Sequence, residues 1–81
     1  MMEYLHSQIC ALIVSRRSAL TQNQIEKGII GYKSRLIEQA INEMLVDQAI
    51  QPMKMGAQTF YQLTLAGWTA YAEYQEGKGA E

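Results

Sequence analysis

The sequence is poor in the residues that form disulfides and metal centres. Its 81 residues include one cysteine, Cys10, and one histidine, His6. A single cysteine excludes an intrachain disulfide. His6 and Cys10 are spaced one helical turn apart, but a closed zinc site would need carboxylates or a second subunit to supply its other ligands. We therefore expect no metal and no other cofactor, and we expect Cys10 to be a packed or partly exposed residue of the first helix.

Long apolar runs and catalytic spacings are also missing. No apolar run approaches the roughly 18–20 residues of a membrane span. Residues 9–14 are apolar, but acidic and aromatic residues precede them and two arginines follow, which is the wrong flanking pattern for a signal peptide. We expect a cytoplasmic protein that makes no membrane contact. His6, Ser7 and Asp47 have no spacing typical of a catalytic triad, so we also expect no enzymatic activity.

The length and composition indicate one small folded domain. Hydrophobic residues make up 48% of the chain and charged residues 19%, which suits a globular protein. A domain of this size buries only about 60–70% of the surface that its unfolded chain exposes, so we expect a homodimer to stabilise it. We place the domain at residues 1–75. Residues 76–81 are polar and contain glycine, and we expect them to form a flexible C-terminal tail.

The charge is unevenly distributed, although the net charge is only −1. Residues 16–35 hold five basic residues and one acidic residue, a local charge of +4. Residues 36–81 hold two basic and six acidic residues, a local charge of −4. Such polarity within one domain favours a positive face that could bind nucleic acid. Ordinary solvated surface charge is the alternative explanation.

The first half of the chain predicts two helices. Residues 2–15 form the first, whose apolar stripe contains Leu5, Ile9, Leu12 and Ile13. A short extended piece at residues 19–20 then leads to Thr21. With Gln24 three residues later, Thr21 makes a capping box that begins a short second helix. Gly31 is expected to make the turn that follows, because glycine reaches positive φ without a steric penalty.

The third helix, residues 33–46, has the clearest helical period. Its inward stripe is Ile37, Ala40, Ile41, Met44 and Leu45. Its outward side carries Lys33, Ser34, Arg35, Glu38, Gln39 and Asn42. Together, the second helix, the turn and the third helix form a helix-turn-helix over residues 21–44.

The last third of the chain predicts a β-hairpin and a fourth helix. Residues 49–54 and 58–63 read as strands joined by a loop that contains glycine. Pro52 cannot donate to a ladder, so the side of its nitrogen must face the edge of the hairpin. Thr64 is a candidate cap for the helix that begins at Leu65. We expect Leu65, Trp68 and Ala72 to line one side of that helix, and Trp68 to pack against the first helix. For Tyr71 and Tyr74 the sequence leaves two roles open: core packing and a dimer interface.

This order of elements resembles the winged helix-turn-helix superfamily, with a three-helix core, a small hairpin or wing, and a C-terminal helix. The class is α+β, mainly α. The chain is similar to the small bacterial MarR- and PadR-like regulators and, in length, to the small fimbrial phase-variation regulators. The segment Tyr61-Gln62-Leu63-Thr64-x-x-Gly67 resembles the Y-x-L-T-x-x-G of those families. Departures from the pattern are Gln48, where a glycine is usual, a wing with one basic residue, and a second helix whose one small residue is Gly28.

The resemblance implies a sequence-specific regulator that binds double-stranded DNA, with helix 33–46 in the major groove. Lys33 or Arg35 would bind guanine, and Gln39 or Asn42 would bind adenine. Lys54, near the wing tip at residue 56, would contact phosphate or the minor groove. The other expected backbone contacts are Arg16, Arg17, Lys27, Tyr32 and Ser34. The arginine pair is equally well explained by solubility.

A winged-helix module that binds a protein partner, without binding DNA, is the alternative function. Overall acidity, the short wing, and Glu38 on the outward face all favour it, and a fold does not fix a function. Glu38 can also accept a hydrogen bond from a cytosine amino group. The sequence therefore leaves both functions open, with DNA binding as the leading one.

Overall fold

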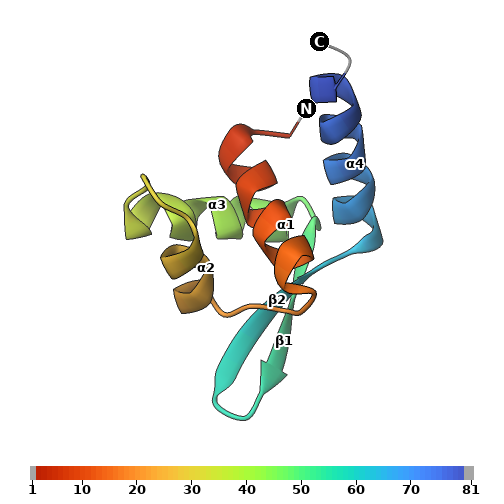
Figure 1. Cartoon of the computed structure of the whole chain (residues 1–81). Helices are drawn as coiled ribbons and strands as arrows, with labels where there is room; N and C mark the ends of the chain where they lie inside the picture. Colours follow the sequence, from red (N-terminus) through yellow and green to blue (C-terminus); the bar gives the residue numbers. More distant parts are fainter. Residues whose placement is uncertain (1, 80–81) are drawn as a thin grey trace.

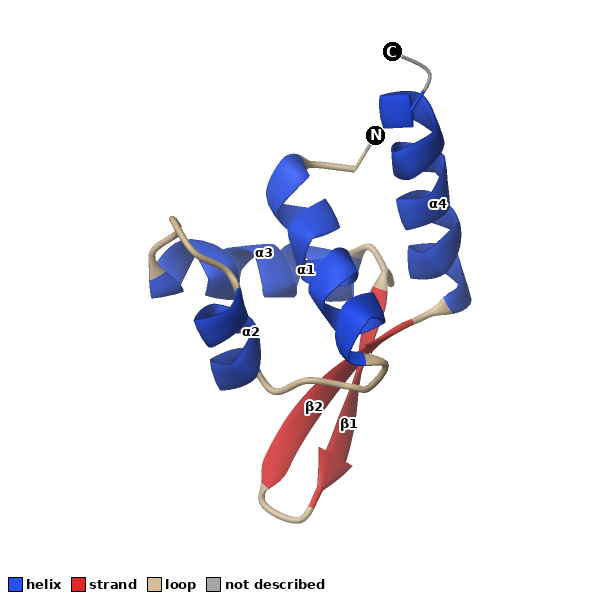
Figure 2. Cartoon of the chain, viewed as in Figure 1, coloured by secondary structure: helices blue, strands red, loops and turns tan. Residues whose placement is uncertain are grey.

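The computed structural model describes residues 2–79 (Figure 1). Over these residues the fold is α+β, with four helices and one two-stranded antiparallel hairpin (Figure 2). The helices are α1 (Tyr4–Arg16), α2 (Gln22–Gly28), α3 (Ser34–Val46) and α4 (Leu65–Gly79). The hairpin consists of β1 (Ile50–Met55) and β2 (Gln58–Leu63), and it projects away from the helices. The predicted class, mainly helical with a small hairpin, is confirmed.

The beginning and end of α2 follow the predicted local signals. The Thr21 hydroxyl accepts a hydrogen bond from the Gln24 backbone N–H at 3.2 Å, and the Gln24 side-chain oxygen accepts one from the Thr21 N–H at 2.9 Å. This capping box satisfies two N–H groups that the helix itself cannot. After α2, Gly31 has φ of +97°, a conformation that side chains disfavour. The capping box and the glycine turn are therefore confirmed.

The core lies between α1, α2, α3 and the base of the hairpin. Four of the five predicted inward residues of α3 are buried, and the fifth, Leu45, is half-buried against the same core. Other buried members come from every part of the fold except α4: Ile9, Cys10, Ile13, Leu20, Ile25, Ile29, Ala49, Ile50 and Leu63. α3 is therefore fixed by its apolar stripe, which leaves its opposite face to solvent.

A short bridge attaches the hairpin to the segment between α1 and α2. The Leu20 N–H donates to the Tyr61 carbonyl at 3.0 Å, and the Tyr61 N–H donates to the Leu20 carbonyl at 2.7 Å. The predicted extended piece at residues 19–20 thus pairs with β2. Because the polar backbone atoms of Tyr61 point to Leu20, its cross-strand partner Pro52 occupies a non-hydrogen-bonded pair. The missing N–H of Pro52 therefore costs no bond of the ladder, as predicted.

The junction between β2 and α4 contains the closest approach of two backbone segments. The Thr64 N–H donates to the Ala49 carbonyl at 3.1 Å, and the Thr64 hydroxyl caps α4 by accepting from the Gly67 N–H at 3.0 Å. The same hydroxyl donates to the Gln48 carbonyl. A Cβ added at Gly67 would lie 1.9 Å from the Ala49 carbonyl oxygen. Only glycine fits here without moving the backbone.

This contact corrects the predicted inward side of α4. Leu65 is 83% exposed and Trp68 is 49% exposed, so neither lies in the core, and Ala72 is exposed as well. The residues that face inward follow Gly67 at helical spacing: Tyr71 packs against the core, and Tyr74 is half-buried. Because Gly67 must face Ala49, the helix is rotated so that Trp68 turns outward. A dimer role for the two tyrosines stays a prediction.

The last helix also extends past the predicted domain boundary. α4 runs to Gly79, four residues beyond residue 75. The expected flexible tail, residues 76–81, thus begins within this helix, and residues 80–81 lie outside the described part of the chain.

Replacing Gly67 with alanine should lower the free energy of unfolding by about 1–3 kcal/mol, because an added methyl collides with the Ala49 carbonyl. The matched control is Gly77→Ala in the same helix, where an added Cβ meets nothing within 4 Å. That variant should gain up to about 1 kcal/mol from helix propensity. Urea denaturation of both proteins measures the difference, and equal effects would show that the close approach is not rigid.

Gln48→Gly should raise the free energy of unfolding by about 0.5–1 kcal/mol. Gln48 has φ of +62°, a left-handed conformation that a side chain disfavours and glycine does not. The control is Gln75→Gly, an exposed position of α4, where glycine should cost about 1 kcal/mol. Thermal unfolding of the two variants distinguishes them, and a loss of stability in both would refute the account of Gln48.

Candidate nucleic-acid interface

The exposed face of α3 gathers the polar side chains that the sequence assigns to base contacts. Arg35, Gln39 and Asn42 are spaced four and three residues apart, so they lie on one side of the helix, and all three are exposed. Val46 continues the same stripe and is 82% exposed. The structure therefore brings these three predicted residues together.

A carboxylate ties α2 to the first turn of α3. The Ser34 hydroxyl donates to Glu26 Oε1 at 2.5 Å, and the Gln22 amide donates to Glu26 Oε2 at 3.0 Å. The hydrogen bond from Ser34, followed by that from Gln22, holds the pKa of Glu26 below its usual value. Ser34 thus positions α3 relative to α2. Its expected contact with phosphate stays a prediction, which would require the hydroxyl to leave this carboxylate.

Two lysines come shortly before the first turn of α3 in the chain. Lys33 is the N-cap residue of α3 and is exposed, so its charge lies near the positive end of the helix dipole. Lys27 is exposed in the last turn of α2, and Tyr32 is half-buried in the turn, packed against the core. Tyr32 precedes α3 by two residues, and Lys27 is next in the chain to Glu26, which binds Ser34 of α3. The N-terminal end of α3 is therefore the part of this face where positive groups concentrate.

The remaining predicted contacts lie on other elements. Arg16 ends α1, and Arg17 follows it in a left-handed conformation with φ of +55°, its N–H bonded to the Ile13 and Val14 carbonyls. Both arginines are exposed where the chain turns toward Leu20 (Figure 1). Lys54 is exposed on β1, next to the hairpin loop. These three residues are thus available to solvent, each away from the stripe on α3.

Sequence reasoning placed Glu38 on this face but missed the rest of its acidic border. A groove of about 640 Å³ lies along α3, and it is lined by Glu3 and His6 of the α1 end and by Arg35, Glu38, Gln39, Asn42, Glu43, Val46 and Asp47. Four of these residues are acidic, and three of the four follow Arg35 in the chain. The charge on α3 therefore changes along its axis, from basic at the first turn to acidic toward its end.

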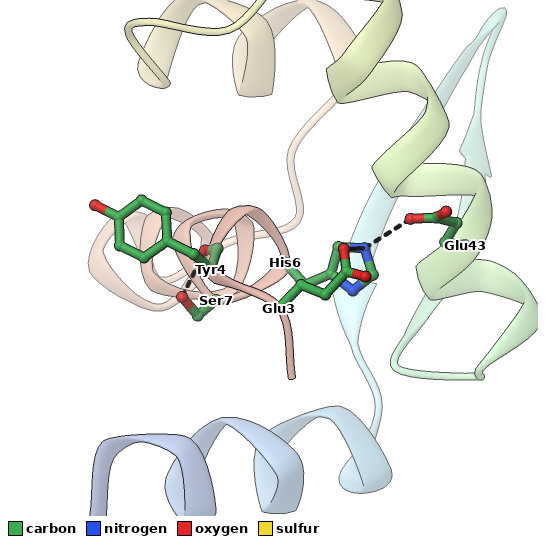
Figure 3. A network of polar contacts seen from close by, with 5 residues as sticks. All are labelled: Glu3, Tyr4, His6, Ser7 and Glu43. Carbon is green, nitrogen blue, oxygen red and sulfur yellow. Dashed lines mark hydrogen bonds and ion pairs between the residues drawn. The ribbon is translucent and has the colours of Figure 1, made fainter. Parts of the chain in front are cut away.

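His6 is the most buried of the residues that line this groove. Its Nε2 atom lies 3.0 Å from Glu43 Oε1 and 3.6 Å from Glu3 Oε2 (Figure 3). Glu3 and His6 are three residues apart, a spacing visible in the sequence, whereas Glu43 is 37 residues from His6 and belongs to another helix. Only the packing of α1 against α3 reveals this contact.

Cys10, one turn after His6, belongs to the core instead. Its side chain is fully buried, and this burial raises the pKa of the thiol to about 11. The thiol is therefore protonated near neutral pH and is a poor metal ligand. The expected packed cysteine is confirmed.

No protein-family model matches this chain, and a search of curated proteins found no similar one. Within residues 2–79, no helix is both long and apolar enough to cross a membrane.

Ser34→Ala should raise the pKa of Glu26 toward its usual value, because the variant loses the hydrogen bond that contributes most to the depression. An NMR titration of the Glu26 carboxyl measures this change. Ser15→Ala is the control, since the Ser15 hydroxyl donates to the Leu12 carbonyl within α1. An unchanged Glu26 pKa in Ser34→Ala would show that Ser34 does not tie α2 to α3.

Proposed function

We propose that this protein is a winged helix-turn-helix transcription regulator that binds double-stranded DNA with α3 in the major groove. The order of its elements supports the fold: a helix, a short strand at Leu20, two helices joined by a turn, a hairpin and a final helix. In proteins of this kind the second helix of the motif inserts into the groove, with its N-terminal residues nearest the bases.

The observation that carries the proposal is the exposed stripe of Arg35, Gln39 and Asn42 on a helix whose other side is anchored in the core. A guanidinium donates two hydrogen bonds to guanine O6 and N7, and a carboxamide pairs with adenine N6 and N7. Arg35 therefore reads guanine, and Gln39 or Asn42 reads adenine. A rigid helix holds all three at fixed spacing, which direct readout requires.

The uneven charge along α3 determines which end of the helix enters the groove. Lys33 caps the beginning of α3 and Arg35 lies in its first turn, whereas Glu43 lies in its last turn and Asp47 follows it. DNA phosphates attract the first pair and repel the second. The helix therefore enters the groove with its N-terminal end, and its acidic end stays at the rim. Glu38, between them, accepts from a cytosine amino group.

Phosphate contacts fix the position of the domain without reading sequence. Lys27 and Lys33 supply them beside α3, Arg16 and Arg17 at the end of α1, and Lys54 from the wing. Because these cations are few, one protomer binds weakly, and a homodimer would place two α3 helices about 34 Å apart, one turn of DNA.

Arg35→Ala should weaken binding to the preferred duplex by about 1–3 kcal/mol, roughly fivefold to more than a hundredfold, and relax the preference for guanine at one position. The preferred duplex would be selected from a random library with the wild-type protein. Fluorescence anisotropy would then measure the affinities of both proteins at several salt concentrations. With three or four neutralised phosphates, the log–log slope should be about −3 to −4.

Ala72→Glu is the matched control, since it changes the net charge by the same −1 at an exposed position of α4. It should leave the affinity and the preference nearly unchanged. If Arg35→Ala binds every duplex as the wild type does, or if no salt-sensitive binding is found, the DNA proposal fails.

A second candidate is a protein-interaction module, and one observation favours it. The lining of the groove along α3 includes four carboxylates and the exposed side chain of Val46, a surface suited to a basic protein partner with an apolar contact. A stoichiometric protein complex that Val46→Lys abolishes, without salt-sensitive DNA binding, would select this function.

A further inference from the structure

His6 is a buried polar residue at the joint between α1 and α3. The residue is 8% exposed, and the edge of its ring that carries Nε2 faces two carboxylates (Figure 3). Glu3 is the N-cap residue of α1, and Glu43 belongs to α3, so the cluster joins two helices. The two acids are more accessible, with side chains 72% and 46% exposed. Ions in solvent can therefore reach the cluster.

The spacing of the three groups matches a metal centre. One ligand atom from each residue can be chosen so that all lie within 4.8 Å of one another. Zinc holds nitrogen and oxygen ligands at about 2.0–2.2 Å in a tetrahedron, which separates the ligand atoms by roughly 3.4 Å. The two distances from His6 Nε2, 3.0 Å and 3.6 Å, lie on either side of that value. A side-chain rotation of the exposed Glu3 can close the remaining distance.

The hydrogen bond from His6 engages only one of the two carboxylates. A single Nε2–H donates well to one acceptor, and Glu43 at 3.0 Å occupies it. The second carboxylate at 3.6 Å then adds negative charge beside the first. A divalent cation balances both carboxylates and also uses the imidazole lone pair.

We propose that Glu3, His6 and Glu43 form a Zn²⁺ site that clamps the beginning of α1 to α3, with water completing the coordination. One imidazole nitrogen and two carboxylate oxygens suit zinc and the neighbouring late transition metals, whereas magnesium and calcium favour oxygen alone. The site revises the expectation of no metal, because the carboxylates that a zinc centre would need come from within the chain. It does not depend on whether α3 binds DNA.

The test is titration of the full-length metal-free protein with ZnCl₂ by isothermal calorimetry, in a buffer that does not chelate zinc. We expect saturable binding of one Zn²⁺ per chain. Zinc should also raise Tm, because a ligand that binds only the folded state stabilises it. Co²⁺ is the spectroscopic probe, and we expect the intense visible absorption of a four-coordinate ion.

Glu43→Gln and Glu3→Gln each replace one ligand by an amide of the same shape. Each should raise the Kd for Zn²⁺ by more than about tenfold, because the loss of even a residue that only supports a ligand weakens metal binding by about that factor. The matched control is Glu38→Gln, which removes a carboxylate from the same groove and should leave the Kd unchanged. Both ligand variants change exposed side chains, so they keep the test valid if a variant of the buried His6 does not fold.

The proposal is overturned if the wild type shows no saturable heat with ZnCl₂. It is also overturned if Glu3→Gln and Glu43→Gln bind zinc as tightly as the wild type, or if Glu38→Gln weakens binding equally. Failure of this titration leaves the DNA-binding assay of Arg35→Ala unaffected, so the two proposals are separable.

Discussion

The arrangement of the C-terminal half depends on one contact between backbones, where Gly67 lies against the Ala49 carbonyl. That carbonyl also accepts the Thr64 N–H, so the end of β2, the start of β1 and the first turn of α4 meet at one point. The contact fixes how α4 is rotated about its own axis. It also holds the first turn of α4 against the base of the hairpin.

Local signals in the sequence were sufficient for three features of the N-terminal half. The Thr21 capping box, the positive φ at Gly31 and the apolar stripe of α3 each act over a few residues, so their physical causes are visible in the chain. The candidate stripe of α3 followed from the same period, since the residues opposite a buried stripe must be exposed. The class of the fold was predictable from the order of such elements.

Two features required long-range information. In α4, apolar residues occur on all sides of the helix, so periodicity could not choose between the side of Trp68 and that of Tyr71. The choice is made by Gly67, whose partner is 18 positions earlier in the chain. The Glu3–His6–Glu43 cluster is a second case, because sequence spacing brings Glu3 to His6 but only helix packing brings Glu43. Residues that act through tertiary contacts leave little trace in local patterns.

The pairing of Pro52 with Tyr61 has a consequence for self-association. An exposed hairpin edge offers unpaired N–H and C=O groups on which another chain can add a strand. Here β2 uses its outer edge at Tyr61 to pair with Leu20, and the outer edge of β1 carries Pro52, which has no hydrogen to donate. A third strand would find one edge partly occupied and the other lacking a donor at its middle. Each edge of the hairpin is thus a poorer template for an added strand at this position.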